Sequence, residues 1–145
     1  MYFDDIVLGT EFTLDDAVID KDEMIDFAKK YDNIPLHTDE EYASKTPFGR
    51  LIAPGLMSFA AVWAKYLEKD IFGPELLAGK SSKIEWLKPV FAGDVLSTTV
   101  TVSKLVDRSP RNGIAELSLS VTNQHGELVM TNLTEAVVKK RQEHC

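Results

Sequence analysis

The stretch from Pro54 to Phe72, PGLMSFAAVWAKYLEKDIF, limits what this chain can fold into more than any other segment. Apolar or small residues recur almost all round the helix over its first three turns. A helix on the surface of a globular protein keeps one polar face in water, whereas a helix that is apolar all round is buried. We therefore predict a long helix that the rest of the chain wraps around.

The segment that follows Gly73 and Pro74 changes from a helical pattern to a strand pattern. β-Branched residues become frequent and apolar residues alternate with polar ones, which is typical of half-buried strands. Short turns separate the segments, and an earlier stretch, VLGTEFTLDD, adds a further strand. The four later segments are SSKIEWLKPV, DVLSTTVTVSKLV, GIAELSLSVTN and LVMTNLTEAVVKK.

Four successive strands predict a largely antiparallel sheet, arranged as a meander that curls round the apolar helix. The order of one strand, then helices, then strands indicates the α+β class. No linker or repeat divides the chain, so we expect a single domain over residues 1–145. A curled sheet leaves edge strands that pairing across a two-fold axis covers, so we expect a homodimer or a higher homo-oligomer.

Two helical segments precede the long helix. DKDEMIDFAKKY begins with Asp20 as a candidate N-cap, with Glu23 three positions on, and its apolar residues recur at helical spacing. This helix is expected to end before Pro35. TDEEYASK then predicts one or two helical turns that start at Thr38.

The charge balance excludes several kinds of partner. The formal net charge is −7, from 23 acidic and 16 basic side chains, and no basic cluster suits a phosphate backbone, so nucleic acid is not an expected partner. No apolar run reaches the roughly 18 residues of a membrane span, and the acidic N-terminus lacks the positive region of a signal peptide. We expect a cytoplasmic protein without a membrane partner. Cys145 is the single cysteine, so neither a disulfide nor a thiolate metal site is expected.

Several sequence blocks together resemble one known family. They are YFDDIVLGTEF, YDNIPLHTD, RLIAPGLMS, WLKPVFAGDVL and NQHGELVM, and they cover nearly the whole chain. In these blocks the chain is similar to the MaoC-like dehydratases, which include the R-specific enoyl-CoA hydratases. The resemblance implies the hot-dog fold, in which an antiparallel sheet wraps a long helix. It also implies reversible hydration of a trans-2-enoyl thioester to an (R)-3-hydroxyacyl thioester, and a dimer.

The YDNIPLH block carries the chemistry that this reaction needs. Hydration requires a base that takes a proton from water and an acid that delivers one to the carbon beside the carbonyl. A carboxylate in a partly dry pocket and an imidazole near neutral pKa can fill these roles, so Asp32 and His37 are the candidate catalytic pair. We expect Pro35 to hold the residues between them in a loop. The alternative is that Asp32 caps a turn and His37 only binds loop backbone.

The third requirement is a donor for the enolate-like oxygen of the substrate. Gly55 opens the long helix, where unpaired N–H groups and the helix dipole favour negative charge, so its amide is the candidate oxyanion donor. Ser58 lies one turn further on and is a candidate for binding substrate or Asp32; the alternative is a small residue packed under the sheet. The family usually has asparagine where this chain has Ile34, and Asn33 is the candidate that replaces it. Pro54 stands where many of these hydratases have histidine.

Three readings of the function follow from these residues. The first is the hydratase, with coenzyme A or acyl carrier protein as part of the substrate and no separate cofactor or metal. The second is a hot-dog thioesterase, in which water attacks the carbonyl carbon. The third is a non-catalytic subunit that binds acyl thioesters, which Ile34 favours. Arg50, Lys83 and Lys88 could meet the phosphates of coenzyme A, but a residue of this kind is more often just a solvated surface charge.

Overall fold

The computed structural model of the chain describes residues 1–143, so Cys145 lies outside the described residues. The N-terminal part contains a short 3₁₀ helix and two short strands. Four α-helices follow, and then a second 3₁₀ helix and four long strands. The elements are η1 (Phe3–Asp5), β1 (Glu11–Thr13), β2 (Ala17–Val18), α1 (Lys21–Tyr31), α2 (Pro35–Thr38), α3 (Glu40–Ser44), α4 (Gly55–Lys69), η2 (Gly73–Glu75), β3 (Leu76–Trp86), β4 (Val95–Asp107), β5 (Asn112–Thr122) and β6 (Leu128–Lys139).

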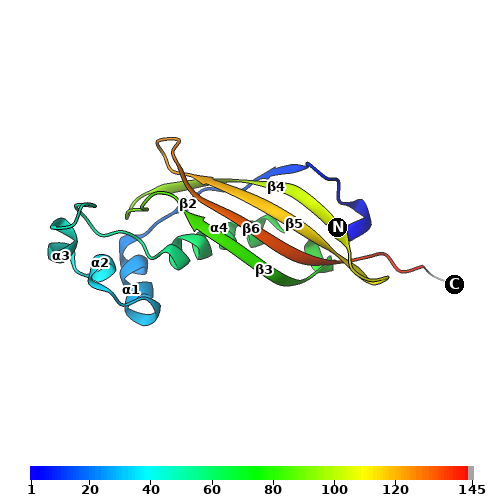
Figure 1. Cartoon of the computed structure of the whole chain (residues 1–145), viewed down its shortest axis with the longest axis horizontal. Helices are drawn as coiled ribbons and strands as arrows, with labels where there is room; N and C mark the ends of the chain where they lie inside the picture. Colours follow the sequence, from blue (N-terminus) through cyan, green and yellow to red (C-terminus); the bar gives the residue numbers. More distant parts are fainter. Residues whose placement is uncertain (144–145) are drawn as a thin grey trace.

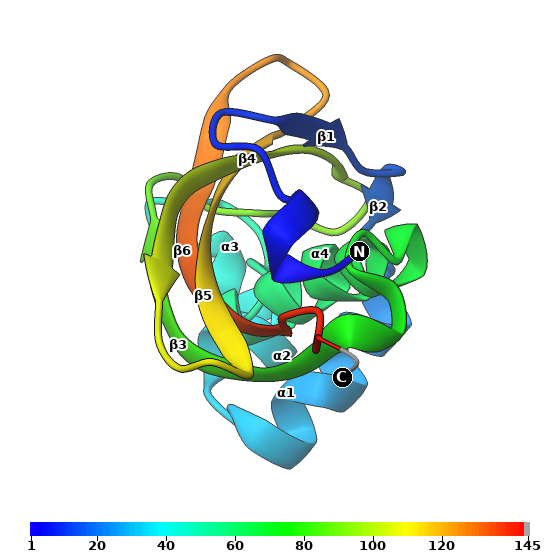
Figure 2. The ribbon, with the colours of Figure 1, turned by 90° about the vertical axis from the view of Figure 1, so that its right-hand side faces the viewer.

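The strands form one curved antiparallel sheet in the order β1-β4-β5-β6-β3, and β2 also pairs with β4. The long strands run along the molecule, with α1, α2 and α3 at one end and both chain ends at the other (Figure 1). Seen end-on, the sheet curls round α4 (Figure 2). This is the α+β arrangement of the hot-dog fold that the sequence predicted.

The meander that the sequence predicted is correct for β4, β5 and β6 and wrong for β3. The first long strand pairs with β6, from Leu76 opposite Val138 to Trp86 opposite Met130, and not with β4. The connection from Leu87 to Asp94 is longer than a hairpin loop and carries the chain from β3, past β6 and β5, to β4. β3 is therefore an edge strand.

The core lies between α4 and the concave face of the sheet. α4 buries Met57, Val62 and Tyr66 against alternate, fully buried residues of the strands. The other side of α4 is not enclosed within the chain, because Leu56 and Leu67 are exposed and several more apolar residues are half-buried. The prediction of a helix wrapped on all sides therefore holds for only one face of α4.

The helices before α4 follow the predicted caps with one shift. Asp20 accepts a hydrogen bond from the Glu23 backbone N–H and caps α1, as predicted. The turns predicted from Thr38 are α3, which begins at Glu40. The sequence did not predict α2, which begins at Pro35 because proline suits the first position of a helix. Asp39 then caps α3 by accepting from the Tyr42 backbone N–H.

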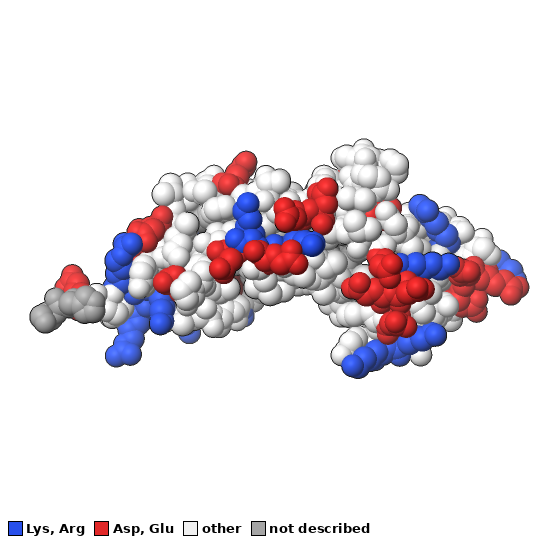
Figure 3. Space-filling model, turned by 180° about the vertical axis from the view of Figure 1, so that it is seen from behind, with Lys and Arg blue, Asp and Glu red and all other residues white. Residues whose placement is uncertain are grey.

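Among residues 1–143, no helix is long and apolar enough to cross a membrane. In the same residues, no group of three or more His, Cys, Asp or Glu side chains is placed to hold a metal ion. Acidic side chains gather at the end formed by α1, α2 and α3, and basic side chains gather near the C-terminal end (Figure 3).

Candidate active site

A cavity of about 530 Å³ lies where α1 and α2, the start of α4 and the end of β3 meet. Its wall is largely apolar, and the polar groups come from three places in the chain: the segment from Asp32 to His37, the first turn of α4, and the end of β3 with the residues after it. The residues that line it are Asp32, His37, Phe48, Ile52, Ala53, Gly55, Leu56, Ser58, Trp86, Leu87, Lys88, Pro89 and Val90.

The structure brings Asp32 and His37 together on this wall. The Asp32 Oδ2 atom lies 3.4 Å from the His37 Nε2 atom, the His37 side chain is buried, and the Asp32 side chain is 36% exposed. No hydrogen bond joins the Asp32 carboxylate to backbone within residues 1–143, so the carboxylate does not cap a turn there. The Asp32 backbone does end α1, because its N–H donates to the Ala28 carbonyl oxygen. The carboxylate is therefore directed to the imidazole.

The hydrogen bond on the other side of the imidazole decides which nitrogen exchanges a proton. The His37 Nδ1 atom lies 2.7 Å from the Ile52 carbonyl oxygen. A carbonyl oxygen can only accept, so Nδ1 carries the hydrogen and donates it. Nε2 is then the nitrogen that gains or loses a proton, and it is the one that faces Asp32.

The segment between the two residues is not the loop that the sequence predicted. Pro35 starts the short helix α2, and His37 lies inside that helix. The pairing survives because Asp32 is the C-cap of α1 and His37 lies in α2, so no single regular helix fixes the angle between the two side chains. Proline still makes the pairing possible, since it forces one helix to end before the next begins.

The first turn of α4 faces the same cavity. Gly55 and Leu56 are the first two residues of the helix, and their N–H groups have no hydrogen-bond partner within the described part of the chain. Free N–H groups at the positive end of a helix are suited to bind a carbonyl oxygen that becomes negative. Gly55 lines the cavity as the first residue of α4, and its role as oxyanion donor stays a prediction.

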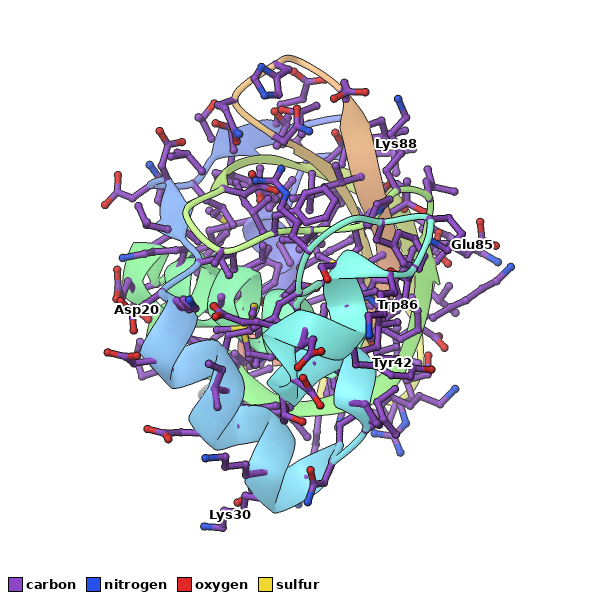
Figure 4. The ribbon with its side chains drawn as sticks, turned by 90° about the vertical axis from the view of Figure 1, so that its left-hand side faces the viewer. Asp20, Lys30, Tyr42, Glu85, Trp86 and Lys88 are labelled. Carbon is purple, nitrogen blue, oxygen red and sulfur yellow. The ribbon has the colours of Figure 1, made fainter. Side chains whose placement is uncertain are left out.

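Trp86, at the end of β3, is a site residue that the sequence did not indicate. Its Nε1–H donates to the Gly55 carbonyl oxygen at 3.0 Å. The indole lies so close that a Cβ atom added to Gly55 would be 2.4 Å from the Trp86 Cε2 atom. Trp86 and Lys88 lie on the β3 side of the end of the molecule that α1, α2 and α3 form (Figure 4). Position 55 therefore requires glycine, because any larger side chain would overlap the indole ring.

Ser58 is buried and lines the cavity, but its hydroxyl does not bind Asp32. Its Oγ–H donates to the same Gly55 carbonyl oxygen at 2.8 Å. The carbonyl oxygen of the first helical residue thus accepts from two side chains. Asn33 is exposed and is not among the residues that line the cavity, so the structure does not bring it to the position that Ile34 leaves without an amide.

The three candidate phosphate-binding residues are each engaged elsewhere. Lys88 pairs with Glu127, and this hydrogen bond holds the pKa of the Glu127 carboxyl below its usual range. Lys83 lies 3.3 Å from Glu85, and the Arg50 guanidinium stacks 3.8 Å from the centre of the Phe91 ring. Of the three, only Lys88 lines the cavity.

The fold and the site together define a hot-dog protein with a carboxylate–imidazole pair and a free helix N-terminus in one largely apolar cavity. The chain belongs to the MaoC-like dehydratase family, because the sequence profile of the MaoC like domain matches residues 6–124.

Individual relatives agree with this assignment. The chain is 30% identical to the uncharacterized protein YdeM of Bacillus subtilis over 97% of this chain and all of that one. It is 34% identical to the (R)-specific enoyl-CoA hydratase of Aeromonas caviae over 72% of this chain and 73% of the hydratase. The crystal structure of the MaoC-like dehydratase from Rhodospirillum rubrum superimposes with a TM-score of 0.86 at 26% identity and covers 99% of both chains.

Proposed function

We propose that this protein reversibly adds water to a trans-2-enoyl thioester and forms an (R)-3-hydroxyacyl thioester. The observation that carries the proposal is the Asp32–His37 pair in the same cavity as the free N–H groups at the start of α4. The apolar wall suits an acyl chain, since Phe48, Leu56 and Val90 line it. The R configuration of the product is supported by the similarity to an (R)-specific hydratase.

In the proposed reaction each group has one role. Asp32 takes a proton from water, and the resulting hydroxide bonds to the β-carbon of the enoyl group. The Nε2–H of protonated His37 delivers a proton to the α-carbon, while the Gly55 N–H holds the oxygen that carries the enolate charge. The proton on Asp32 then returns to His37 across the 3.4 Å that separates Oδ2 from Nε2. The balance is one water added across the double bond.

We also propose that the protein is a homodimer that forms through β3. This strand pairs with β6 on one side only, and nine of its eleven residues are exposed. Half-buried Phe59 and Trp63 of α4 lie beside the same strand, where they line a shallow hollow with residues 79–82. Pairing of β3 with its copy across a two-fold axis would cover both the strand edge and these aromatic rings. Sedimentation equilibrium tests the dimer, and a monomer at all protein concentrations would contradict it.

The reaction is tested by incubating the purified protein with short, medium and branched enoyl-CoAs. Loss of the conjugated double bond and release of free thiol are followed in parallel. A hydratase should consume the double bond without releasing free thiol. Thiol release with the double bond intact would assign a thioesterase, and no reaction with any enoyl thioester would assign a subunit that only binds acyl thioesters.

A further inference from the structure

The His37 ring is held by a peptide group that lies outside α1 and α2. Its Nδ1 atom lies 2.7 Å from the carbonyl oxygen of Ile52. The N–H of the same peptide group, which belongs to Ala53, donates to the Val90 carbonyl oxygen, also at 2.7 Å. Hydrogen bonds that share a peptide group polarise each other, so the Ile52 oxygen is a stronger acceptor than an isolated carbonyl. One peptide therefore ties the imidazole to the connection between β3 and β4.

The position of the Ile52 oxygen decides which nitrogen of neutral His37 carries the hydrogen. A neutral imidazole has one N–H, and His37 has an acceptor at each nitrogen: the Ile52 oxygen at 2.7 Å from Nδ1 and the Asp32 Oδ2 atom at 3.4 Å from Nε2. The nearer acceptor keeps the hydrogen on Nδ1. If the Ile52 oxygen moved away, the hydrogen would move to Nε2 and bind the carboxylate. Nε2 could then not take the proton back from Asp32, as the proposed reaction requires.

A buried carboxylate fixes the connection that holds this peptide. Asp94, the last residue of the connection, is only 5% exposed, and its carboxylate forms no ion pair within residues 1–143. Its Oδ2 atom accepts from the Phe91 N–H and its Oδ1 atom accepts from the Gln124 side-chain N–H, each at 2.9 Å. The Gln124 Oε1 atom accepts in turn from the Val95 N–H at 3.0 Å. These hydrogen bonds offset the cost of burying the charge, and they join the connection to the turn between β5 and β6.

Phe91 is the link between the carboxylate and the Ile52 peptide. It directly follows Val90 and faces Ile52 in an isolated antiparallel bridge. Within residues 1–143, the Phe91 N–H has no hydrogen-bond acceptor other than the Asp94 carboxylate. Backbone hydrogen bonds with Ile19 hold the connection only further on, at Gly93 and at the Asp94 carbonyl oxygen. The side chain of Asp94 is therefore the group that fixes the part of the connection next to Ile52.

We infer that Asp94 is a positioning residue of the proposed reaction. Its carboxylate fixes the backbone at Phe91 and Val90, Val90 fixes the Ile52–Ala53 peptide, and this peptide keeps the hydrogen of neutral His37 on Nδ1. Asp94 does not line the candidate active site, so it acts without touching the substrate. Its effect on turnover rests on the proposed function, whereas the position of the hydrogen is measurable without substrate.

Nitrogen-15 NMR of the imidazole tests the inference directly, because the shift of a ring nitrogen shows whether it carries hydrogen. Protein labelled at histidine is measured at alkaline pH, where imidazoles are neutral. The His37 signals are those that His37→Gln lacks. We expect hydrogen on Nδ1 in the wild type. In Asp94→Ala we expect the Nδ1–H form to lose intensity to an Nε2–H form.

A pair of conservative substitutions tests whether the hydrogen bonds of Asp94 are the cause. Asp94→Asn keeps the size of the side chain but places an N–H group against the Gln124 N–H, so one hydrogen bond is lost. It should show a smaller loss of the Nδ1–H form than Asp94→Ala. In Asp94→Asn/Gln124→Glu, one oxygen of the new carboxylate accepts from the new amide and the other from the Val95 N–H. This double variant should recover the wild-type signals.

Turnover of enoyl-CoA is measured on the same preparations. In Asp94→Ala, kcat should fall about tenfold to 100-fold, since a small displacement of a catalytic group costs that much, and KM should change less than kcat. Asp20→Ala is the control for stability, because it also removes a carboxylate that accepts from one backbone N–H, and it should keep both kcat and the Nδ1–H form.

Three results would overturn the role of Asp94: an unchanged Nδ1–H form in Asp94→Ala, the same change in Asp20→Ala, or no recovery in the double variant. A fall in kcat while the hydrogen stays on Nδ1 would also contradict it. Absence of turnover in the wild type would overturn the proposed reaction instead, and the nitrogen signals would still decide whether Asp94 fixes the His37 ring.

Discussion

The Trp86 Nε1 atom lies 3.0 Å from the Gly55 carbonyl oxygen, and this hydrogen bond joins the end of β3 to the first residue of α4. The same oxygen accepts from the Ser58 hydroxyl at 2.8 Å. The Gly55 carbonyl belongs to the same peptide group as the Leu56 N–H, so two donors on the oxygen polarise that N–H. The indole therefore strengthens the Leu56 N–H as a second donor to the oxyanion, and it fixes the position of the first turn of α4, which also carries the Gly55 N–H.

Trp86→Phe tests this role, because phenylalanine keeps an aromatic ring, although a smaller one, and has no N–H to donate. Losing one hydrogen bond of about 1 kcal/mol should lower kcat about fivefold. KM should change less than kcat, because the loss falls on the oxyanion that develops in the transition state. Leu87→Ala, a neighbouring change on the same cavity wall, should raise KM by removing acyl contacts. If Trp86→Phe raised KM as much as Leu87→Ala does and left kcat unchanged, a positioning role for Trp86 would be contradicted.

Gly55→Ala should be damaging for a steric reason. The new Cβ atom would lie 2.4 Å from the Trp86 ring, so the indole or the start of α4 has to move. Gly79→Ala is the matched control, since nothing lies within 4 Å of a Cβ atom at that position. Turnover should fall in Gly55→Ala and recover in part when Trp86→Leu removes the clash. Additive losses in the double variant would show that the two residues act independently.

Asp32 and His37 should behave as one catalytic unit. Asp32→Asn and His37→Gln keep approximate size, and each should lower turnover by about 10²–10⁴-fold. The double variant should be little worse than the poorer single one, because both groups act in one transition state. Turnover per folded molecule is measured beside the melting temperature of each preparation.

The control for this pair is a carboxylate with a purely structural contact. Asp20 caps α1, so Asp20→Ala should lower stability by about 0.5–2 kcal/mol and leave turnover unchanged. The Asp32 carboxylate makes no such cap within residues 1–143, so Asp32→Asn should melt close to the wild type. A destabilised but fully active Asp32→Asn protein would end the catalytic interpretation.

Tyr66 should make the protein less stable at alkaline pH. Its side chain is buried, its hydroxyl has no hydrogen-bond partner within residues 1–143, and burial raises its pKa from 10.0 to about 12. Above pH 10 the unfolded chain loses this proton while the folded protein keeps it. The free energy of unfolding therefore falls by about 1.4 kcal/mol per pH unit up to roughly pH 12 through this group.

Urea unfolding of Tyr66→Phe between pH 8 and about pH 11 measures this contribution. The variant should lose the alkaline decline that belongs to Tyr66 and should be at least as stable as the wild type near pH 7, because an unpaired buried hydroxyl is removed. Tyr42→Phe changes an exposed tyrosine and should leave the pH dependence unaltered. Parallel stability curves for the wild type and Tyr66→Phe would contradict the assignment.

The sequence by itself determined the features that depend on near neighbours along the chain. The cap of α1 by Asp20, the start of α4 at Gly55 and the strands β4, β5 and β6 follow from local spacing and alternation. The Asp32–His37 pairing was also accessible, because the two residues are close in sequence and Pro35 separates their helices. Local propensity and side-chain period act over a few residues, so a single sequence records them.

Only the tertiary structure decided the contacts between distant segments. The place of β3 beside β6, the hydrogen bond from His37 to the Ile52 carbonyl and the contact of Trp86 with Gly55 left no periodic signal. The WLKPV segment indicated a strand, but nothing in it indicated that its tryptophan would reach the start of a helix 31 residues earlier. Such contacts depend on how the curled sheet and α4 pack as whole bodies, and the packing of whole elements is set by all of their side chains together.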